Sequence, residues 1–372
     1  MKYGIISLNI YEKDNNWGSI LQSYALQEYL KSINIDVKII NYKPKVIKFN
    51  EAKYPILKYS PFKLKRFLKI LPSILKDWKN FVNRDKKFQS FINSYYSCTK
   101  KMEEKDFQKN DFDGFVVGSD IVWNDEFWNG LEKVFFCDFD GMKEKNNIAY
   151  APSMATNGFK KENEDALKIL LRNFNYISVR EKSKVDYISS FTKLDVINVL
   201  DPTLLLNFSD YKKFVLNDLI NEPYLLVYCV DQNYYLLKYA YEYCIKNNLK
   251  LVTIKCCPGK RYNDIKSINY DAAGIEEWIT LIKNANFVLT TSFHACIFSI
   301  IFKKRFYAIY HKFGKSKIVD LLDTLSLSNF SSKVEDIDMN YIIDYDSVYK
   351  KIDELKNNSI SYLNKSLHRE EE

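Results

Sequence analysis

The sequence predicts an α/β protein with two domains, each built around a parallel sheet. Short runs rich in Val, Ile and Tyr alternate with helix-like stretches along most of the chain. Such alternation is typical of parallel strands that are joined by helices. A new strand-like run starts at Pro223 after a polar stretch, and 372 residues are too many for one ordinary core. We therefore expect a second domain to begin near residue 222.

The first domain is expected over residues 1–205. Its predicted elements are, in order, a strand at 3–11, a helix at 15–33, strands at 36–42, 112–120 and 146–155, a helix near 162–173, and strand-to-turn segments at 176–188 and 197–205. The strands are short apolar runs that end in Gly, Ser, Asp or Pro, which are turn-forming residues. The helix at 15–33 places four apolar or aromatic residues on one face: Leu21, Tyr24, Ala25 and Tyr29.

The second domain is expected over residues 222–345, followed by a helical tail over 346–372. Its predicted elements are, in order, a strand at 223–231, a helix at 234–248, a strand at 249–256, a helix at 275–285, a strand at 286–291 and a helix-like run at 295–302. The same alternation of strand and helix predicts a second parallel sheet.

One segment carries the positive excess of the chain. Residues 43–101 contain 16 Lys and Arg against 3 Asp and Glu, a net charge of +13, whereas the whole chain is +8. Within it, residues 61–78 interleave Phe and Leu with Lys and Arg, which predicts a basic amphipathic helix broken at Pro72. A solvated helical insertion and a surface for anionic membranes or lipid-linked substrates both fit this pattern. Nucleic acid does not, because no nucleic-acid-binding motif accompanies the charge.

Cysteine usage and hydropathy indicate a cytoplasmic protein. The seven cysteines are odd in number and form no C-x-x-C pair or metal-ligand spacing, which favours free thiols in a reducing compartment. The first residues form a short apolar run broken by charge, which predicts a first strand rather than a signal peptide. No stretch approaches the roughly 18 to 20 apolar residues that span a bilayer.

Ligands of parallel sheets collect beyond the carboxyl ends of the strands, so the turns that follow strands are the candidate site. The turn Asn16-Trp17-Gly18-Ser19 opens a helix whose free N–H groups suit an anion or an oxygen-rich ligand. Asp120 follows another strand, after Gly118-Ser119. Arg180 ends a strand, where a guanidinium can bind a carboxylate or phosphate, although a surface ion pair explains it equally well. We interpret Asp201, before Pro202, as a turn residue.

His294 is one of three histidines, and it lies between a strand-like run and a helix-like run, behind Thr290-Thr291-Ser292. The start of a helix offers unpaired N–H groups and a partial positive charge. With Ser292, His294 would form an anion pocket that contains an acid–base group. A histidine that only caps its helix or fills the core is the alternative.

Seven blocks, taken in order, resemble the polysaccharide pyruvyl transferase family over about residues 3–330. They are NWGSILQSYAL, FDGFVVGSDIVWN, IAYAPSMA, ISVREKS, VLDPTLLL, EEWITLIKNANFVLTTSFHACIFSIIF and KFGKSKIVDLLDTL. The resemblance implies a GT-B-like architecture, in which two Rossmann-like domains with parallel sheets face each other across a cleft. It also implies transfer of a pyruvyl group from phosphoenolpyruvate (PEP) to two hydroxyls of one sugar, which gives a cyclic ketal and phosphate and requires neither metal nor redox cofactor.

The resemblance, combined with this chemistry, assigns roles to particular residues. His294 is expected to do the acid–base work and Arg180 to bind the carboxylate or phosphate of PEP. Ser292 and the lysines Lys315 and Lys317 complete the donor site; the family often has Arg near these lysines, which lack its bidentate fork. The acceptor sugar is expected to face the first domain, at Asn16, Trp17, Gly18, Ser19 and Asp120. The acceptor would belong to a cell-surface glycan or its precursor, at the inner face of the membrane if it is lipid-linked.

Two other classes of function fit parts of the sequence. A GT-B glycosyltransferase would use a nucleotide-sugar donor and need an acidic residue in the second domain, where Glu276 and Glu277 lie inside a predicted helix. A catalytically silent scaffold would bind glycan or membrane through residues 43–101. The presence of both His294 and Arg180 argues against the scaffold.

Overall fold

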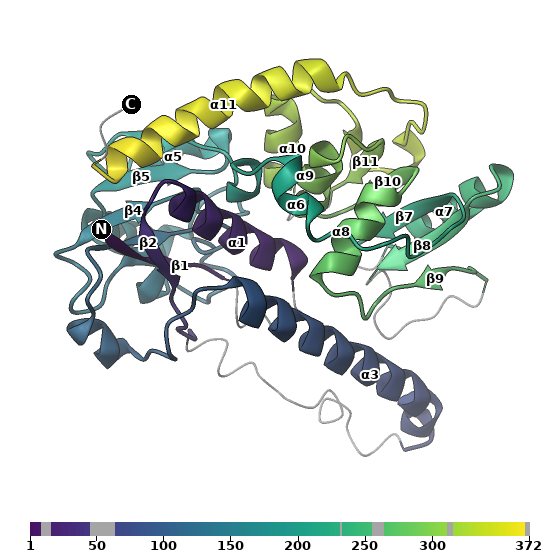
Figure 1. Ribbon diagram of the computed structural model, residues 1–372, viewed down its shortest axis with the longest axis horizontal. Helices are drawn as coiled ribbons and strands as arrows, with labels where there is room; N and C mark the ends of the chain where they lie inside the picture. Colours follow the sequence, from purple (N-terminus) through teal and green to yellow (C-terminus); the bar gives the residue numbers. More distant parts are fainter. Residues whose placement is uncertain (9–15, 45–63, 231–232, 255–263, 311–314, 369–372) are drawn as a thin grey trace.

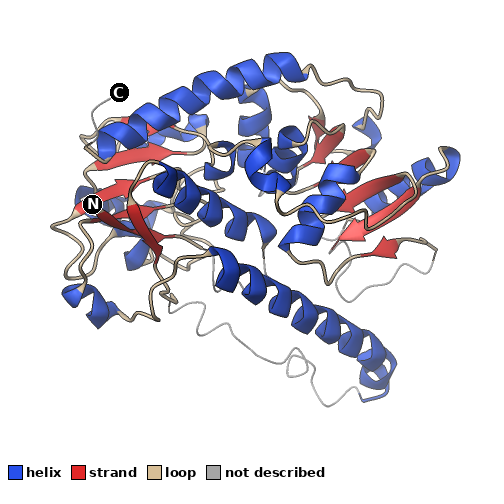
Figure 2. Ribbon diagram, viewed as in Figure 1, coloured by secondary structure: helices blue, strands red, loops and turns tan. Residues whose placement is uncertain are grey.

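The chain folds into two parallel sheets flanked by helices (Figures 1 and 2). The computed structural model describes residues 1–8, 16–44, 64–230, 233–254, 264–310 and 315–368, without the side chains of 64–77 and 315–316. Each sheet has six strands, and every strand pair is parallel. The predicted α/β fold, with two parallel-sheet domains in a GT-B-like arrangement, is confirmed.

The first sheet has the strand order β2-β1-β3-β4-β5-β6. Its strands are β1 (Lys2–Ile6), β2 (Asp36–Ile39), β3 (Gly114–Val117), β4 (Asn146–Ala149), β5 (Tyr176–Val179) and β6 (Val196–Asn198). The second sheet has the order β12-β11-β10-β7-β8-β9. Its strands are β7 (Tyr224–Tyr228), β8 (Lys250–Ile254), β9 (Ile268–Asn269), β10 (Phe287–Thr290), β11 (Phe306–Ile309) and β12 (Phe330–Ser331).

The strand orders show where ligands should gather. In the first sheet the chain reverses its direction of strand addition between β1 and β3, and in the second between β7 and β10. Such switch points open a crevice at the carboxyl ends of the strands. Two helices begin there, α1 (Trp17–Ser32) after β1 and α9 (Phe293–Ile301) after β10. Two of the turns that the sequence singled out, residues 16–19 and 290–292, therefore lie at switch points.

The remaining helices cover the sheets or connect them. They are α3 (Leu64–Tyr95), α4 (Glu164–Leu170), α5 (Val185–Ser189), α6 (Phe208–Lys212), α7 (Tyr234–Lys246), α8 (Ile275–Asn284), α10 (Lys315–Thr324) and α11 (Tyr345–Ser366). Two short 3-10 helices matter for the site: η7 (Lys182–Lys184) and η8 (Pro202–Leu204). No helix in the described ranges is long and apolar enough to cross a membrane.

Trp17, the first residue of α1, fastens the first domain to the second. Its side chain is fully buried, and its indole N–H lies 3.0 Å from the carbonyl oxygen of Gly274 at the start of α8. The ring stacks on Trp278, with the ring centroids 6.4 Å apart, and meets the ring of Phe88 edge-on. An aromatic side chain from one domain thus completes the core of the other.

Helix α3 runs unbroken through Pro72, so the predicted break there is wrong (Figure 1). Proline removes one helix hydrogen bond, but the second half of α3 is held by contacts to the second domain. The Nη1 of Arg84 donates to the carbonyl oxygen of Asp271 at 2.7 Å, and Lys87 Nζ pairs with Glu277 at 2.6 Å. Residues 45–63 and the basic side chains of 64–77 lie outside the described part of the chain.

Helix α11 also spans both domains and crosses the top of the view in Figure 1. Near its start, the Tyr349 hydroxyl donates to the carbonyl oxygen of Ile301, the last residue of α9, at 2.9 Å. Near its end, the Tyr362 hydroxyl donates to the carbonyl oxygen of Ala149 in β4 at 3.0 Å. With Trp17 and α3, this helix fixes how the two sheets face each other.

Replacing Trp17 with Ala should destabilise the protein strongly. Loss of a fully buried indole typically costs about 3 to 5 kcal/mol, and here both domains lose the contact. Urea unfolding of the variant should show a much lower midpoint, whereas Tyr235→Ala, at a side chain that is 74% exposed, should unfold like the wild type. Equal midpoints for Trp17→Ala and Tyr235→Ala would show that Trp17 does not hold the domains together.

Candidate active site

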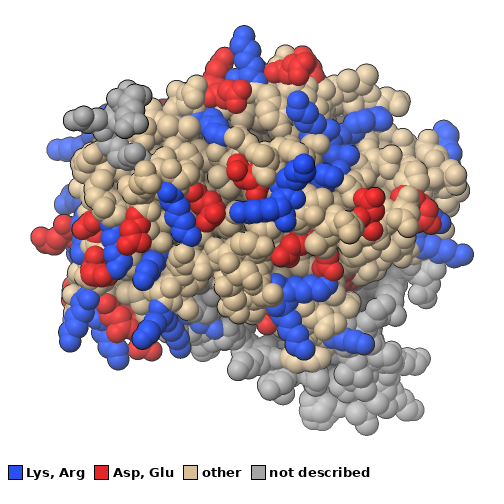
Figure 3. Space-filling model, viewed as in Figure 1, with Lys and Arg blue, Asp and Glu red and all other residues tan. Residues whose placement is uncertain are grey.

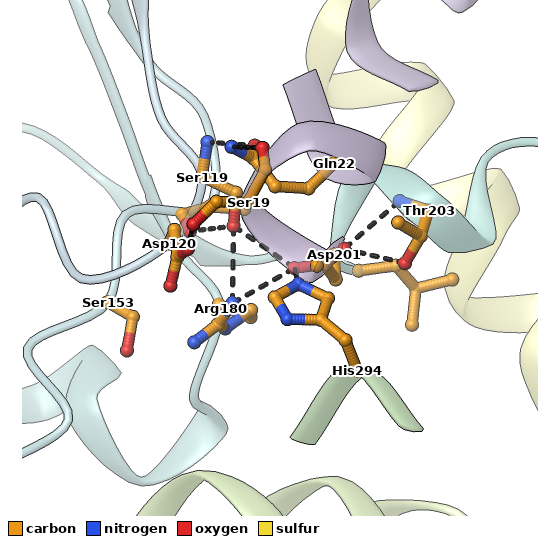
Figure 4. Close-up of polar contacts among 12 residues, drawn as sticks. Ser19, Gln22, Ser119, Asp120, Ser153, Arg180, Asp201, Thr203 and His294 are labelled. Atoms are coloured by element: carbon orange, nitrogen blue, oxygen red, sulfur yellow. Dashed lines mark hydrogen bonds and ion pairs between the residues drawn. The ribbon is translucent and has the colours of Figure 1, made fainter. Parts of the chain in front are cut away.

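Asp201 lies where the two domains meet, three residues after the end of β6 and at the start of η8. Its Oδ1 accepts the backbone N–H of Thr203 at 3.0 Å and the Thr203 hydroxyl at 2.7 Å, which caps η8. Its Oδ2 points the other way, toward Arg180 and His294 (Figure 4). Burial raises the pKa of this carboxyl, but His294 and Arg180 outweigh that effect and hold the pKa well below its usual value. Asp201 is therefore ionised at neutral pH.

Arg180 follows β5 and is buried beside Asp201. Its Nη1 lies 3.0 Å from Asp201 Oδ2, and its Nε lies 3.3 Å from Glu181 Oε1. The guanidinium stands over the ring of Phe293, 4.1 Å from the centroid, a favourable cation–π contact. Burial lowers the pKa of Arg180, but Glu181, Asp201 and Asp120 together raise it above its ordinary value. The remaining nitrogen, Nη2, makes no hydrogen bond within the described part of the chain.

His294 comes from the second domain, as the second residue of α9. Ser292 caps this helix by accepting the N–H of Ala295 at 3.4 Å. His294 Nε2 lies 3.6 Å from Asp201 Oδ2, just beyond hydrogen-bonding distance, and finds no hydrogen-bond partner among the described residues. Two buried nitrogens, Arg180 Nη2 and His294 Nε2, thus make no hydrogen bond to a described residue at this domain junction, although Asp201 Oδ2 lies within ion-pair distance of His294 Nε2. A ligand with oxygen acceptors would satisfy both.

Gly18 makes room for the His294 imidazole. A Cβ atom at Gly18 would lie 2.0 Å from His294 Nδ1 and 2.7 Å from His294 Cβ, so only glycine fits there. The flanking residues of the turn have different tasks. Asn16 caps α1 by accepting the N–H of Gly18 at 3.0 Å, and the Ser19 hydroxyl donates to Asp120.

Asp120 and its neighbours form the floor of the site in the first domain. Asp120 has a φ of +66°, in the left-handed region that most residues other than glycine avoid and that Asp tolerates better than most. The adjacent Ser119 donates its N–H to Gln22 Oε1 at 2.9 Å and its hydroxyl to Asp201 Oδ2 at 3.2 Å. This network links the start of α1 to the Arg180 and Asp201 pair.

The structure brings together most of the residues that the sequence singled out. Five of them meet at the domain junction: His294, Arg180, Gly18, Ser19 and Asp120. Ser292 caps the helix that carries His294. Lys317 lines a recess of about 30 Å³ that Arg180 and Asp201 also line. The side chain of Lys315 lies outside the described part of the chain.

Trp17 departs from the expectation for the acceptor side, because it is buried in the second domain and has no surface left for a sugar. Asp201 was interpreted as a turn residue, and it is one. Its second carboxylate oxygen, Oδ2, nevertheless lies at the centre of the site, between Arg180 and His294. The sequence analysis missed Glu181, next to Arg180, and Phe293, next to His294. Glu is common at strand ends and Phe is common in cores, so neither residue type signals a site.

Comparison with known proteins decides the family. A model of the polysaccharide pyruvyl transferase family matches residues 16–312, which include Arg180, Asp201 and His294 but end before Lys315 and Lys317. The chain belongs to the polysaccharide pyruvyl transferase family. The resemblance noted in the sequence is thus confirmed over residues 16–312. Family membership indicates polysaccharide pyruvyl transfer in general terms.

The chain also resembles several solved structures at low identity. The UDP-GlcNAc 2-epimerase from Methanocaldococcus jannaschii is 12% identical over 96% of this chain and 93% of its own, with a TM-score of 0.48. The UDP-GlcNAc 2-epimerase from Neisseria meningitidis is 9% identical over 98% of this chain and 94% of its own, with a TM-score of 0.47. The glycosyltransferase SnogD from Streptomyces nogalater is 10% identical over 98% of this chain and 99% of its own, with a TM-score of 0.42. A comparison with curated proteins finds no match.

Replacing Gly18 with Ala should impair pyruvyl transfer without unfolding the protein. The new methyl group would push His294 out of place, and a misplacement of about 1 Å can cost about 10²-fold in rate. Overpacking a core typically costs about 1 to 3 kcal/mol, and the higher helix propensity of alanine offsets about 1 kcal/mol of that cost, so the variant should lose some thermal stability but stay folded at the assay temperature. Turnover assays should show the loss for Gly18→Ala but not for Ser32→Ala at the exposed end of α1. Full activity in Gly18→Ala would mean that the position of His294 is not critical.

Proposed function

We propose that this chain transfers a pyruvyl group from PEP to two hydroxyls of one sugar in a cell-surface glycan or its precursor, forming a cyclic ketal. Family membership supports pyruvyl transfer. The observation that carries the choice of donor is the pair of buried nitrogens that make no hydrogen bond to a described residue, Arg180 Nη2 and His294 Nε2. PEP offers a carboxylate and a phosphate in a small volume, and a buried guanidinium is well suited to bind either anion.

The donor is expected between the carboxyl ends of β5 and β10. Arg180 would bind one anionic group through Nη2, since Nη1 and Nε are already engaged with Asp201 and Glu181. Lys317 lines the same recess as Arg180 and would bring a second positive charge to PEP. Asp201 acts as a positioning residue, because its Oδ2 contacts the guanidinium and faces the imidazole.

The chemistry needs two additions at C2 of PEP and the loss of phosphate. A sugar hydroxyl adds to C2 while C3 gains a proton and becomes a methyl group. Phosphate then leaves C2, and the second hydroxyl bonds there and closes the ring. Of the two hydroxyl protons, one is balanced by the proton gained at C3 and the other leaves with phosphate. His294 is the group that we propose exchanges these protons with the reactants.

The acceptor sugar is expected beside Asp120, which lies at the junction in the first domain, while the fully buried Ser19 holds the Asp120 carboxylate. The Asp120 carboxylate already accepts the Ser19 hydroxyl and can accept a sugar hydroxyl in the same way. We also propose that residues 43–101 contact an anionic membrane where a lipid-linked acceptor would lie. The net charge of +13 in this segment supports that contact. By contrast, acidic and basic side chains are interspersed over the described part of the face in Figure 3.

Mass spectrometry of candidate glycans after incubation with the enzyme tests the reaction. With PEP, a sugar should gain about 70 Da, the mass of pyruvate less water that ketal formation adds. Loss of an acid–base group typically costs about 10²- to 10⁴-fold, so folded His294→Ala should form little product. Gain of a hexose mass from UDP-sugars instead would indicate a glycosyltransferase. Near wild-type turnover in His294→Ala would leave His294 with a structural role.

Replacing Arg180 with Lys should weaken PEP binding by about tenfold or more, because an ammonium cannot keep Asp201 and bind an oxyanion in the geometry of the guanidinium. Calorimetric titration with PEP would measure the effect, with exposed Arg172→Lys as the matched control. The double variant Lys315→Ala, Lys317→Ala should also bind PEP more weakly. Unchanged affinity in both the Arg180 variant and the double lysine variant would place the donor elsewhere.

A further inference from the structure

A second recess lies at the end of α9 that is remote from His294. Its volume is about 340 Å³, within the range of small-molecule sites. Three segments line it: the stretch from η8 into α6, the end of α9, and the middle of α11. Its buried floor is apolar, formed by Leu204, Ile300, Ile301 and Ile352. Pockets where separate parts of a chain meet are common ligand sites.

This recess is separate from the candidate active site. His294 is the second residue of α9 and Ile301 is the last, so about 10 Å of helix lies between them. None of the residues assigned to PEP or to proton exchange lines the recess. A ligand bound there would leave Arg180 and His294 accessible to PEP.

The rim of the recess is polar and carries both signs of charge. Lys356 Nζ donates to Asn207 Oδ1 at 2.9 Å. Burial lowers the pKa of Lys356, while Asp210 and Asp353 partly offset that effect. Lys303 lies near the same rim, over the ring of Tyr349 at 4.8 Å. Asp353 and Lys356 line the recess together, so a charged ligand would meet a like charge as well as an opposite one, and the rim favours a neutral ligand that can donate and accept hydrogen bonds.

Phe208 gives the recess an exposed aromatic face. It is the first residue of α6 and is 41% exposed, although its ring also packs edge-on against Phe302 at 5.6 Å. An exposed aromatic ring next to hydrogen-bonding groups suits a ligand with one apolar face and a polar edge. The C–H face of a sugar ring and its hydroxyls have this division.

We propose that this recess binds a neutral sugar unit of the glycan, away from the sugar that reacts. The C–H face of the sugar would lie on Phe208 and the apolar floor. Its hydroxyls would donate to Asp353 and accept from Lys356 or Ser209. The glycan as the source of the sugar rests on the proposed function, whereas the binding chemistry rests on the recess alone.

Binding of neutral disaccharides to the full chain tests this proposal without any turnover. Lactose, maltose and cellobiose are titrated by ligand-observed NMR, with glucuronate as an anionic comparison. At least one disaccharide should bind, and Phe208→Ala and Asp353→Asn should each weaken it by up to about tenfold, the range for losing an aromatic contact. Leu216→Ala is the matched control, because Leu216 is also an apolar residue that is 41% exposed.

His294→Ala distinguishes this site from the proposed reaction. The variant should keep its disaccharide affinity while losing pyruvyl transfer. Absence of ketal product with intact, Phe208-dependent sugar binding would overturn the proposed reaction but not the recess. The recess proposal would be overturned by no binding of any disaccharide, by equal binding in the Phe208 and Asp353 variants, by loss of binding in His294→Ala, or by tighter binding of glucuronate.

Discussion

The carboxylate of Asp201 has two oxygens that face different parts of the molecule, and the site depends on both. Oδ1 is held by Thr203 within the first domain, while Oδ2 lies 3.0 Å from Arg180 Nη1 and 3.6 Å from His294 Nε2. A buried carboxylate is costly unless it is paired and hydrogen-bonded. Here the compensating groups come from both domains, so the charge balance of the site and the approach of the domains are coupled.

Aromatic and helical contacts around the junction hold the two domains in a fixed relative position. Trp17 enters the second core at the start of α1, and the same turn places Gly18 against His294. Helices α3 and α11 bridge the domains on other sides, through the Lys87–Glu277 pair and through the Tyr349 and Tyr362 hydroxyls. The reacting groups are therefore positioned by contacts that are mostly distant from the chemistry, which is how a site at a domain boundary can be held rigidly.

The sequence predicted the parallel sheets and the turns that carry the site, because strand periodicity and turn residues are local signals. It also pointed to Arg180, His294 and Asp120, since polar residues beyond parallel strands lie at a shared edge. It did not reveal the role of Asp201, because a local capping function explained that residue fully and the contact with His294 joins residues distant in sequence. The predictions of an acceptor role for Trp17 and of a helix break at Pro72 were wrong. Trp17 is buried because it packs against Trp278 and Gly274 of the second domain, a contact between residues distant in sequence.

The measurement that tests this account most directly is a crystal structure of the wild-type chain with an unreactive analogue of PEP. The account predicts an anionic oxygen of the analogue about 3 Å from Arg180 Nη2, with its C2 and C3 beside His294 and with Asp201 still contacting the guanidinium. An analogue bound away from both Arg180 and His294, or a bound state in which Asp201 contacts neither residue, would contradict it.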